Sequence, residues 1–250
     1  MRQWTDVLAA DLGEMLIVLV GLIAVAGFIA IVWWSSKQAK KRLAALQAVA
    51  AELGLLFDPT QDPDHDERFK QFAIFQIGDT RRAYNTMQGE LAIGGADRAV
   101  ITGDFKYTVT SSNGKQTTRT TYHLSYLLVQ LEHAVPELII RRENFFDKIK
   151  AFLGFDDIDF ESAEFSKRFA VKSTDKRFAW DLIDPRMIEW LLDTDCPAIE
   201  LDGDWMCMVD RSRWKPEDYR GKIVLADAFM NHWPEHTVRG IAEGRYGRDD

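Results

Sequence analysis

The sequence predicts an α+β protein in which an N-terminal transmembrane helix precedes an antiparallel-sheet domain covered by helices. An uncharged apolar stretch, residues 15–34, comes before a polar chain of ordinary globular composition. Several segments between residues 69 and 142 are rich in β-branched and aromatic residues, and glycine turns separate them. Helical periodicity dominates the later part. Meandering strands followed by a C-terminal amphipathic helix are also the order of a pleckstrin-homology-like barrel.

The apolar stretch is long enough to cross a bilayer. A hydrocarbon core of about 30 Å needs about 20 apolar residues at about 1.5 Å of helical rise each. Backbone groups inside lipid must pair within the segment, which selects a helix. The anchor is expected to consist of the apolar run and its aromatic and basic exit, marked by Met15, Trp33, Trp34, Lys37, Lys40, Lys41 and Arg42.

The charges on either side of this stretch predict its orientation. The charged residues among the first fourteen positions are three acidic residues and one arginine, whereas four basic residues lie between 37 and 42. Basic residues beside a span stay in the cytoplasm, so the N-terminus is expected outside and the C-terminal domain inside. A cleaved signal peptide would need a basic head and a small-residue cleavage site, and a buried core helix would not explain the asymmetric flanks.

Five regions follow from this interpretation. Residues 1–14 form a short extracytoplasmic N-terminus, 15–34 the transmembrane helix and 35–57 a juxtamembrane helix with Gly54 as its cap. Residues 58–236 form the cytoplasmic α+β domain. Residues 237–250 are polar and glycine-containing, and they are expected to be a flexible tail.

The strands are expected at 69–77, 82–93, 99–110, 115–132, 136–142, 169–172, 198–201 and 205–209, with hairpin turns at Asn113-Gly114 and Asp202-Gly203. A two-residue turn at Asn113-Gly114 would place Ser112 opposite Lys115 and Phe105 opposite Tyr122. In that register the aromatic side chains share one face of the sheet and the Thr, Lys and Arg side chains share the other. One face therefore packs and the other meets water.

Helices are expected at 144–153, 175–183, 185–192 and 216–233, where they would cover the sheet. Asp175 and Asp184 have the positions of N-caps, and Pro185 suits a first helical turn because its missing N–H costs nothing there. Cys196 and Cys207 lack a zinc-like spacing and are expected to be small core residues.

The net charge of −8 makes nucleic acid an unexpected partner, because an acidic domain repels phosphate backbones. The expected partners are the lipid bilayer and another protein. Gly21, Gly27 and Ala30 would also let two membrane helices approach closely, which permits a homodimer. No cofactor is expected, since the sequence has no glycine-rich phosphate loop and no nucleophile-elbow motif.

Three groups of residues are weak candidates for chemistry. His123 falls opposite Asp104 in the expected register and would form half of a triad. Asp156, Asp157 and Asp159 offer carboxylates for acid–base work, although an acidic run is more often solvated. His232 and His236 have the four-residue spacing of a metal pair, but Pro234 lies between them.

A further set of residues carries a family resemblance across most of residues 38–210. It comprises mainly aromatic, apolar and small residues: Leu43, Leu46, Ala50, Leu53, Gly54, Leu55, Phe69, Phe72, Phe75, Gly78, Asn85, Gly89, the run from Asp104 to Tyr107, Pro136, Phe160, Glu161, Phe165, Phe169, Val171, Asp175, Ala179 and Asp184-Pro185. This pattern resembles a family of bacterial single-pass membrane proteins of unknown function. The resemblance implies a bacterial inner-membrane protein and carries over no catalytic residue.

The sequence therefore favours a membrane-tethered interaction or scaffold module without a catalytic signature. Two alternatives stay open. One is a membrane-bound hydrolase that uses the acidic run or the His123–Asp104 pair. The other is a small-ligand sensor, which needs an apolar cavity between the sheet and a helix.

Overall fold

The structure is a computed structural model that describes the backbone of residues 2–114, 116–142 and 157–247. It describes side chains in these ranges from residue 19 onward, residues 20 and 22 excepted. The chain divides into two compact units, Met1–Ala45 and Leu46–Asp250.

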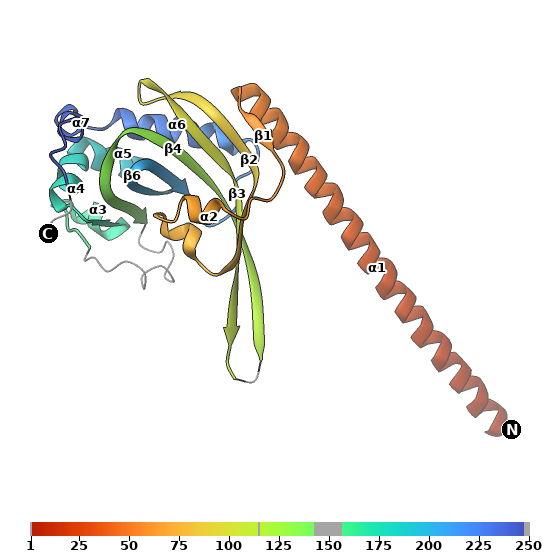
Figure 1. The fold of residues 1–250 in the computed structure, drawn as a ribbon. Coiled ribbons are helices and arrows are strands. Elements are labelled where there is room, and N and C mark those ends of the chain that lie inside the picture. Colours follow the sequence, from red (N-terminus) through yellow and green to blue (C-terminus); the bar gives the residue numbers. More distant parts are fainter. Residues whose placement is uncertain (1, 115, 143–156, 248–250) are drawn as a thin grey trace. The chain divides into compact units, whose positions relative to one another are not determined.

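The first unit consists of most of α1 (Arg2–Leu53), a continuous helix of 52 residues (Figure 1). Trp33 and Trp34 are 63% and 61% exposed, and Lys37 Nζ lies 4.9 Å from the centre of the Trp33 ring. Met15 and several other residues of the expected span lie outside the described side chains. Within the part of the chain whose side chains are described, no helix has the length and apolar character needed to cross a bilayer.

The second unit is α+β, which confirms the predicted class (Figure 1). Its strands are β1 (Leu56–Asp58), β2 (Asp79–Ile93), β3 (Ala96–Ser112), β4 (Thr117–Arg142), β5 (Phe169–Ser173) and β6 (Ala198–Val209). Its other helices are α2 (His65–Arg68), a 3-10 turn η1 (Ala73–Gln76), α3 (Ala163–Arg168), α4 (Lys176–Leu182), α5 (Pro185–Asp193), α6 (Asp218–Asn231) and α7 (Glu235–Ala242).

The strands form one antiparallel sheet in the order β1-β2-β3-β4-β5, with β6 also paired to β4. Strand β4 pairs with β3 over Thr117–Val129, with β6 over Tyr126–Ile140 and with β5 over Leu138–Arg142. Because β4 contacts three other strands, it is the central element of the sheet.

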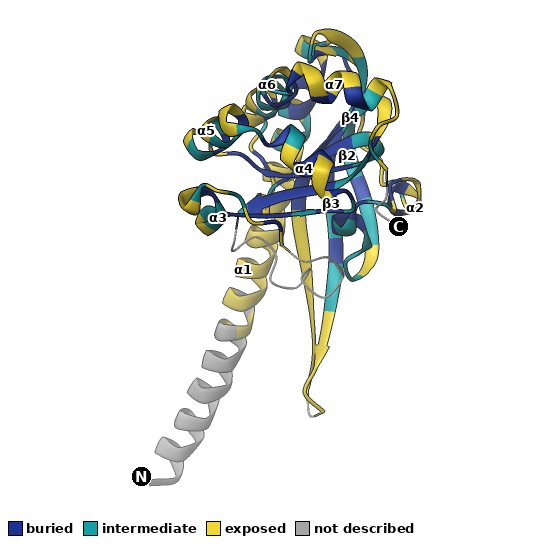
Figure 2. Cartoon of the chain, turned by 90° about the vertical axis from the view of Figure 1, so that its left-hand side faces the viewer, coloured by how far each residue is buried: buried dark blue, intermediate teal, exposed yellow. Residues whose placement is uncertain are grey.

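Two separate cores pack on the opposite faces of this sheet. In Figure 2 much of β4 is coloured as buried. Leu127, Val129 and Met208 face the helices α4, α5 and α6. Leu124, Tyr126 and Leu128, which alternate with them, face the aromatic segment that contains α2 and η1. Since both faces are packed here, the prediction that one face of the sheet stays wet is wrong for the centre of the sheet. At the outer hairpin, the described side chains of residues 110–123 are exposed on both faces.

The β3–β4 hairpin has the predicted faces but a register shifted by two residues. Phe105 pairs with Leu124, and Tyr107 pairs with Tyr122. The shift arises because Ser112 pairs with Thr117, two residues later than a two-residue turn at Asn113-Gly114 requires. A shift of two preserves which side chains share a face.

The predicted hairpin at Asp202-Gly203 is wrong. Residues 198–209 form the single strand β6, and Gly203 (φ +60°) lies at an irregularity in its pairing with β4. Glycine accepts this backbone conformation without steric cost, so a turn signal here marks a bulge. The expected strands 115–132 and 136–142 are likewise one strand, β4.

The predicted strand at 69–77 is also wrong. This segment forms turns and η1, and it packs Phe69, Phe72 and Phe75 against the sheet. Tertiary packing of these rings outweighs their strand propensity. The expected helix at 144–153 lies outside the described residues.

The expected flexible tail, residues 237–250, contains most of α7. Thr237 is fully buried and donates its hydroxyl hydrogen to the Asp181 carbonyl at 2.7 Å. Tyr246 Oη donates to Asp181 Oδ2 at 2.9 Å, and Gly247 N donates to Asp175 Oδ2 at 3.1 Å. These bonds attach the segment to α4. Residues 248–250 lie outside the described range.

The predicted caps are confirmed, and one supports a stability test. Asp184 accepts a hydrogen bond from Met187 N at 2.8 Å at the start of α5. We expect Asp184→Ala to lower the free energy of unfolding by about 1 kcal/mol. Asp193→Ala, at the exposed last turn of the same helix, is the control and should change it by less than about 0.5 kcal/mol. Urea denaturation of both variants measures the difference, and equal losses would contradict the cap.

Candidate functional site

Asp104 is fully buried and pairs with Ser125 across the β3–β4 ladder. Its carboxylate accepts hydrogen bonds from Ser125 Oγ (2.7 Å), Asn85 Nδ2 (3.0 Å) and Tyr219 Oη (3.1 Å). Asn85 reaches it because a bulge in β2 places this residue at φ +52°, which asparagine tolerates. The cluster ties α6 to the sheet.

His123 precedes Ser125 by two residues on β4, and it pairs with Lys106 of β3. Its Nδ1 lies 2.8 Å from Tyr84 Oη. Partial burial, with a smaller effect from Arg213, lowers the pKa of His123. The predicted pairing of His123 with Asp104 is wrong, because it depended on the two-residue turn that the hairpin does not have.

Ser125 and Tyr219 belong to the Asp104 cluster and were not among the predicted site residues. Ser125 Oγ lies 3.1 Å from Tyr219 Oη and accepts from Trp214 N at 3.0 Å. The sequence places Tyr219 in the apolar stripe of α6, but nothing in it indicates that its hydroxyl meets an aspartate. All three side chains are fully buried, so this cluster has the character of a structural network.

The acidic candidates do not meet this cluster in the described structure. Asp157 and Asp159 are exposed, and Asp157 Oδ1 lies 3.7 Å from Lys172 Nζ. Asp156 lies outside the described residues.

The two metal candidates lie on different elements. His232 follows α6, and its Nδ1 lies 2.7 Å from the Ala228 carbonyl oxygen. The ring centres of His232 and Trp190 are 5.2 Å apart. His236 is exposed on α7, beyond Pro234. Among the residues whose side chains are described, no group of three or more metal-ligating side chains occurs.

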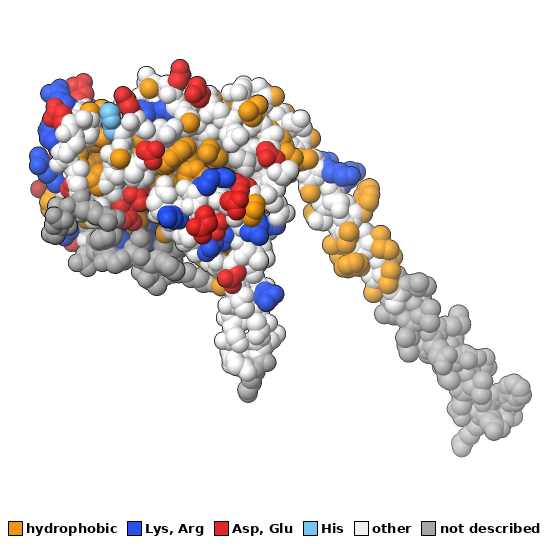
Figure 3. All heavy atoms as spheres, viewed as in Figure 1, with side chains coloured by type: hydrophobic (Ala, Val, Ile, Leu, Met, Phe, Trp, Pro, Cys, Tyr) orange, Lys and Arg blue, Asp and Glu red, His pale blue; other side chains and the backbone are white. Residues whose placement is uncertain are grey.

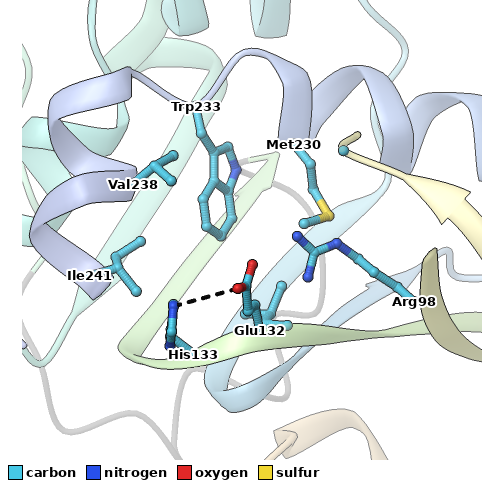
Figure 4. A pocket seen from close by; sticks show the side chains of 9 residues that line it. Arg98, Glu132, His133, Met230, Trp233, Val238 and Ile241 are labelled. Atoms are coloured by element: carbon cyan, nitrogen blue, oxygen red, sulfur yellow. Dashed lines mark ion pairs between the residues drawn. The ribbon is translucent and has the colours of Figure 1, made fainter. Parts of the chain in front are cut away.

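A pocket of about 100 Å³ lies where α6 and α7 meet the β2–β3 turn and β4 (Figure 4). Five apolar side chains line it: Leu131, Met230, Trp233, Val238 and Ile241. The turn is held in place because Gly94 N donates to Asp227 Oδ1 at 2.8 Å. A Cβ atom at Gly94 would come within 2.9 Å of Met230 Cβ, so this position needs glycine.

The polar side chains of the pocket come from the strands and from the end of α6. Arg98 extends from β3, and Glu132 and His133 extend from β4 (Figure 4). Glu132 Oε1 and His133 Nε2 are 3.9 Å apart, and both side chains are substantially exposed. Trp233 Nε1 is buried and has no hydrogen-bond acceptor in the described structure. The sequence assigns Trp233 to an apolar stripe and gives no signal for Arg98.

The second unit is thus a helix-covered antiparallel sheet with a small amphiphilic pocket. No protein-family model and no curated protein matches the chain. A similar solved structure is the crystal structure of the mycobacterial trehalose monomycolate transport factor A, TtfA, with a TM-score of 0.54 and 12% sequence identity. The match covers 77% of this chain and 96% of that chain. At this identity the likeness concerns the fold alone.

Proposed function

We propose that the chain is a membrane-tethered, non-catalytic interaction module whose β3–β4 hairpin binds another protein. The observation that carries the proposal is the extension of this hairpin beyond the rest of the sheet (Figure 1). Strand β2 stops pairing with β3 at Thr108, and β6 stops pairing with β4 at Tyr126.

The outer part of the hairpin has free edges and little packing of its own. In the described structure, no third strand pairs with residues 109–112 or 117–125. Most described side chains from residue 110 to 123 are exposed, and Figure 3 shows mainly uncharged polar groups at the end of the hairpin. A two-stranded ribbon with open edges is marginally stable alone and can accept an added strand from a partner.

Support for the tether comes from the sequence of residues 15–42, from the exposed Trp33 and Trp34, and from the resemblance to bacterial single-pass proteins. In this proposal the N-terminus lies outside the inner membrane and the α+β unit in the cytoplasm. The proposal also includes a pleckstrin-homology-like arrangement of the strands and helices in the α+β unit. TtfA, a trehalose monomycolate transport factor, has a similar fold, and a transport factor is compatible with a non-catalytic module.

The register provides a direct test of the hairpin. Thr108 pairs with Thr121, and their hydroxyl oxygens are 3.1 Å apart. Replacing residues 109–120 by Asn-Gly would therefore close a tight turn at the end of the three-stranded region. We expect the shortened chain to keep its melting temperature within a few degrees and to lose its main partner in a crosslinked pull-down from native membranes.

The matched control is Val224→Ala, at an exposed residue of α6 away from the hairpin, which should retain the partner. A shortened chain that captures the same partner at the same yield would contradict the role of the hairpin. The tether has a separate test. A reporter fused after Asp250 should be active in the cytoplasm, and carbonate should not release the protein from membranes.

A further inference from the structure

The buried indole of Trp233 needs a hydrogen-bond acceptor. Its Nε1 atom is shielded from solvent, and none of the described residues accepts its hydrogen. A buried donor without an acceptor costs about 1–3 kcal/mol. Trp233 lines the pocket between α6, α7 and the β2–β3 turn, so the acceptor can be a molecule that enters this space (Figure 4).

Arg98 supplies positive charge to the same space. Its Nε donates to the Ile93 carbonyl at 3.0 Å, and its Nη1 donates to the Gln130 carbonyl at 3.4 Å. Both acceptors are neutral, so these bonds position the guanidinium, and Arg98 has no ion pair with a carboxylate among the described residues. A guanidinium has five N–H donors, so three stay available to an anion.

The remaining wall limits the size and polarity of a ligand. Leu131, Met230 and Ile241 give the pocket an apolar side. Its volume of about 100 Å³ is well below that of a site for a drug-sized molecule, which is about 300–1,000 Å³. Glu132 would repel an anion, but its side chain is 72% exposed, and solvent screens such a charge.

We propose that this pocket binds a carboxylate with a short apolar chain, with the oxygens at Trp233 Nε1 and Arg98 and the chain against Leu131, Met230 and Ile241. The carboxylate can belong to a small free acid or to the head of a fatty acid whose chain leaves through the open side at Val238, which is 48% exposed. This site goes beyond the proposed interaction through the hairpin and does not depend on it.

The test uses the full-length chain in lipid nanodiscs with ¹³C-labelled methionine methyl groups. Met230 lines the pocket, and Met230→Leu identifies its signal. Butyrate, n-butanol and n-butylammonium have the same chain with different charges. We expect butyrate to shift the Met230 methyl signal and to bind about tenfold more tightly than butanol. Butylammonium should bind more weakly than either.

Variants locate the two donors. Trp233→Phe keeps the apolar ring but removes the N–H, and Arg98→Gln removes the charge. Each should weaken butyrate binding about tenfold and leave butanol binding unchanged. Glu132→Gln should tighten butyrate binding. Trp190→Phe, a tryptophan outside the pocket, is the matched control and should change nothing.

Dodecanoate separates the two sources. Tighter binding of dodecanoate than of butyrate would identify the ligand of the pocket as a fatty acid. Binding no tighter than that of butyrate would identify it as a small free acid. Equal affinity for butyrate and butanol would overturn the proposal, and so would unchanged butyrate binding in both donor variants. A Met230 signal that no probe shifts would also overturn the proposal. Water would then be the acceptor for the Trp233 N–H. The other methionine signals report whether each variant is folded, and Trp233→Phe keeps the test valid if Arg98→Gln unfolds.

Discussion

Asp104→Ala is expected to lower the free energy of unfolding by about 3 kcal/mol, because it leaves several buried donors without their acceptor. Asn85 Nδ2, Ser125 Oγ and Tyr219 Oη all donate to this carboxylate. Asp104 and Ser125 are fully buried, so water cannot replace the lost oxygens without opening the contact between α6 and the sheet. Urea denaturation of the full-length chain in detergent measures the loss.

The control for this prediction is Asp97→Ala, at an exposed residue of the same strand, which should change stability by less than about 0.5 kcal/mol. Tyr219→Phe removes one donor and should cost about 1 kcal/mol. In a double-mutant cycle, the combined Asp104→Ala and Tyr219→Phe variant should lose less than the sum of the two. Strict additivity, or a loss at Asp104 as small as that at Asp97, would show that the cluster is not a coupled network.

The faces of the strands and the helix starts could be predicted from the sequence because both depend on local spacing. Side chains alternate along a strand whatever the length of the loop, so the grouping of Phe105, Tyr107 and Tyr122 survived a register error of two residues. Asp175 and Asp184 cap helices through a bond that spans three residues. Strand alternation and helix capping each depend on residues that are only a few positions apart in the sequence.

The errors share a different physical origin. Phe69, Phe72 and Phe75 look like a strand locally, but their segment forms turns and a short 3-10 helix. Phe75 packs against Phe105 and Tyr126, which are distant in sequence. A glycine signals positive φ without stating whether the chain reverses or bulges. Such choices depend on long-range packing, which periodicity does not encode.

The pocket could not have been predicted for the same reason. Gly94 and Arg98 come from a turn and its strand, Leu131 from a bend in β4, and Trp233 and Ile241 from the C-terminal helices. The wall formed by α7 depends on hydrogen bonds such as that from Thr237 to the Asp181 carbonyl. The polar composition of this segment gives no sign of these hydrogen bonds. From the sequence, a cavity between sheet and helix was only a requirement of the ligand-sensor alternative.

The second large effect is expected at His65, whose replacement should change how stability depends on pH. This side chain is 1% exposed and packs among Phe75, Phe105 and Tyr126. Burial lowers the pKa of His65 from 6.5 to about 4, with smaller opposing effects from Asp62 and Asp66. The folded state therefore holds a neutral imidazole where the unfolded chain would bind a proton.

The sign of the effect follows from this difference in proton binding. Well above pH 6.5 the imidazole is neutral in both the folded and the unfolded state, so it makes no pH-dependent contribution to stability. As the pH falls from 6.5 towards 4, only the unfolded state gains the proton, so the fold loses up to about 3 kcal/mol, given 1.36 kcal/mol for each unit of pKa shift. His65→Phe removes this proton uptake. Its stability relative to the wild type should rise by about that amount between pH 6.5 and pH 4.

Glu200 acts in the opposite direction, so the comparison must be made between variants. Burial, with the nearby Glu137, raises the pKa of Glu200 from 4.5 to about 7. Its folded state therefore keeps a proton that the unfolded state loses, and this contribution to stability disappears as the pH rises from 4.5 to 7. The wild type should consequently show a flatter profile than either group would give alone.

Urea unfolding of wild type, His65→Phe and Glu200→Gln between pH 4 and pH 8 separates the two contributions. His65→Phe should gain relative stability towards acid, whereas Glu200→Gln should gain it towards neutral pH. A constant difference between His65→Phe and wild type over pH 4–6.5 would mean that the buried imidazole takes up its proton as readily in the folded state as in the unfolded chain. That result would require water or an acceptor to reach Nε2, which no described residue contacts with a hydrogen bond.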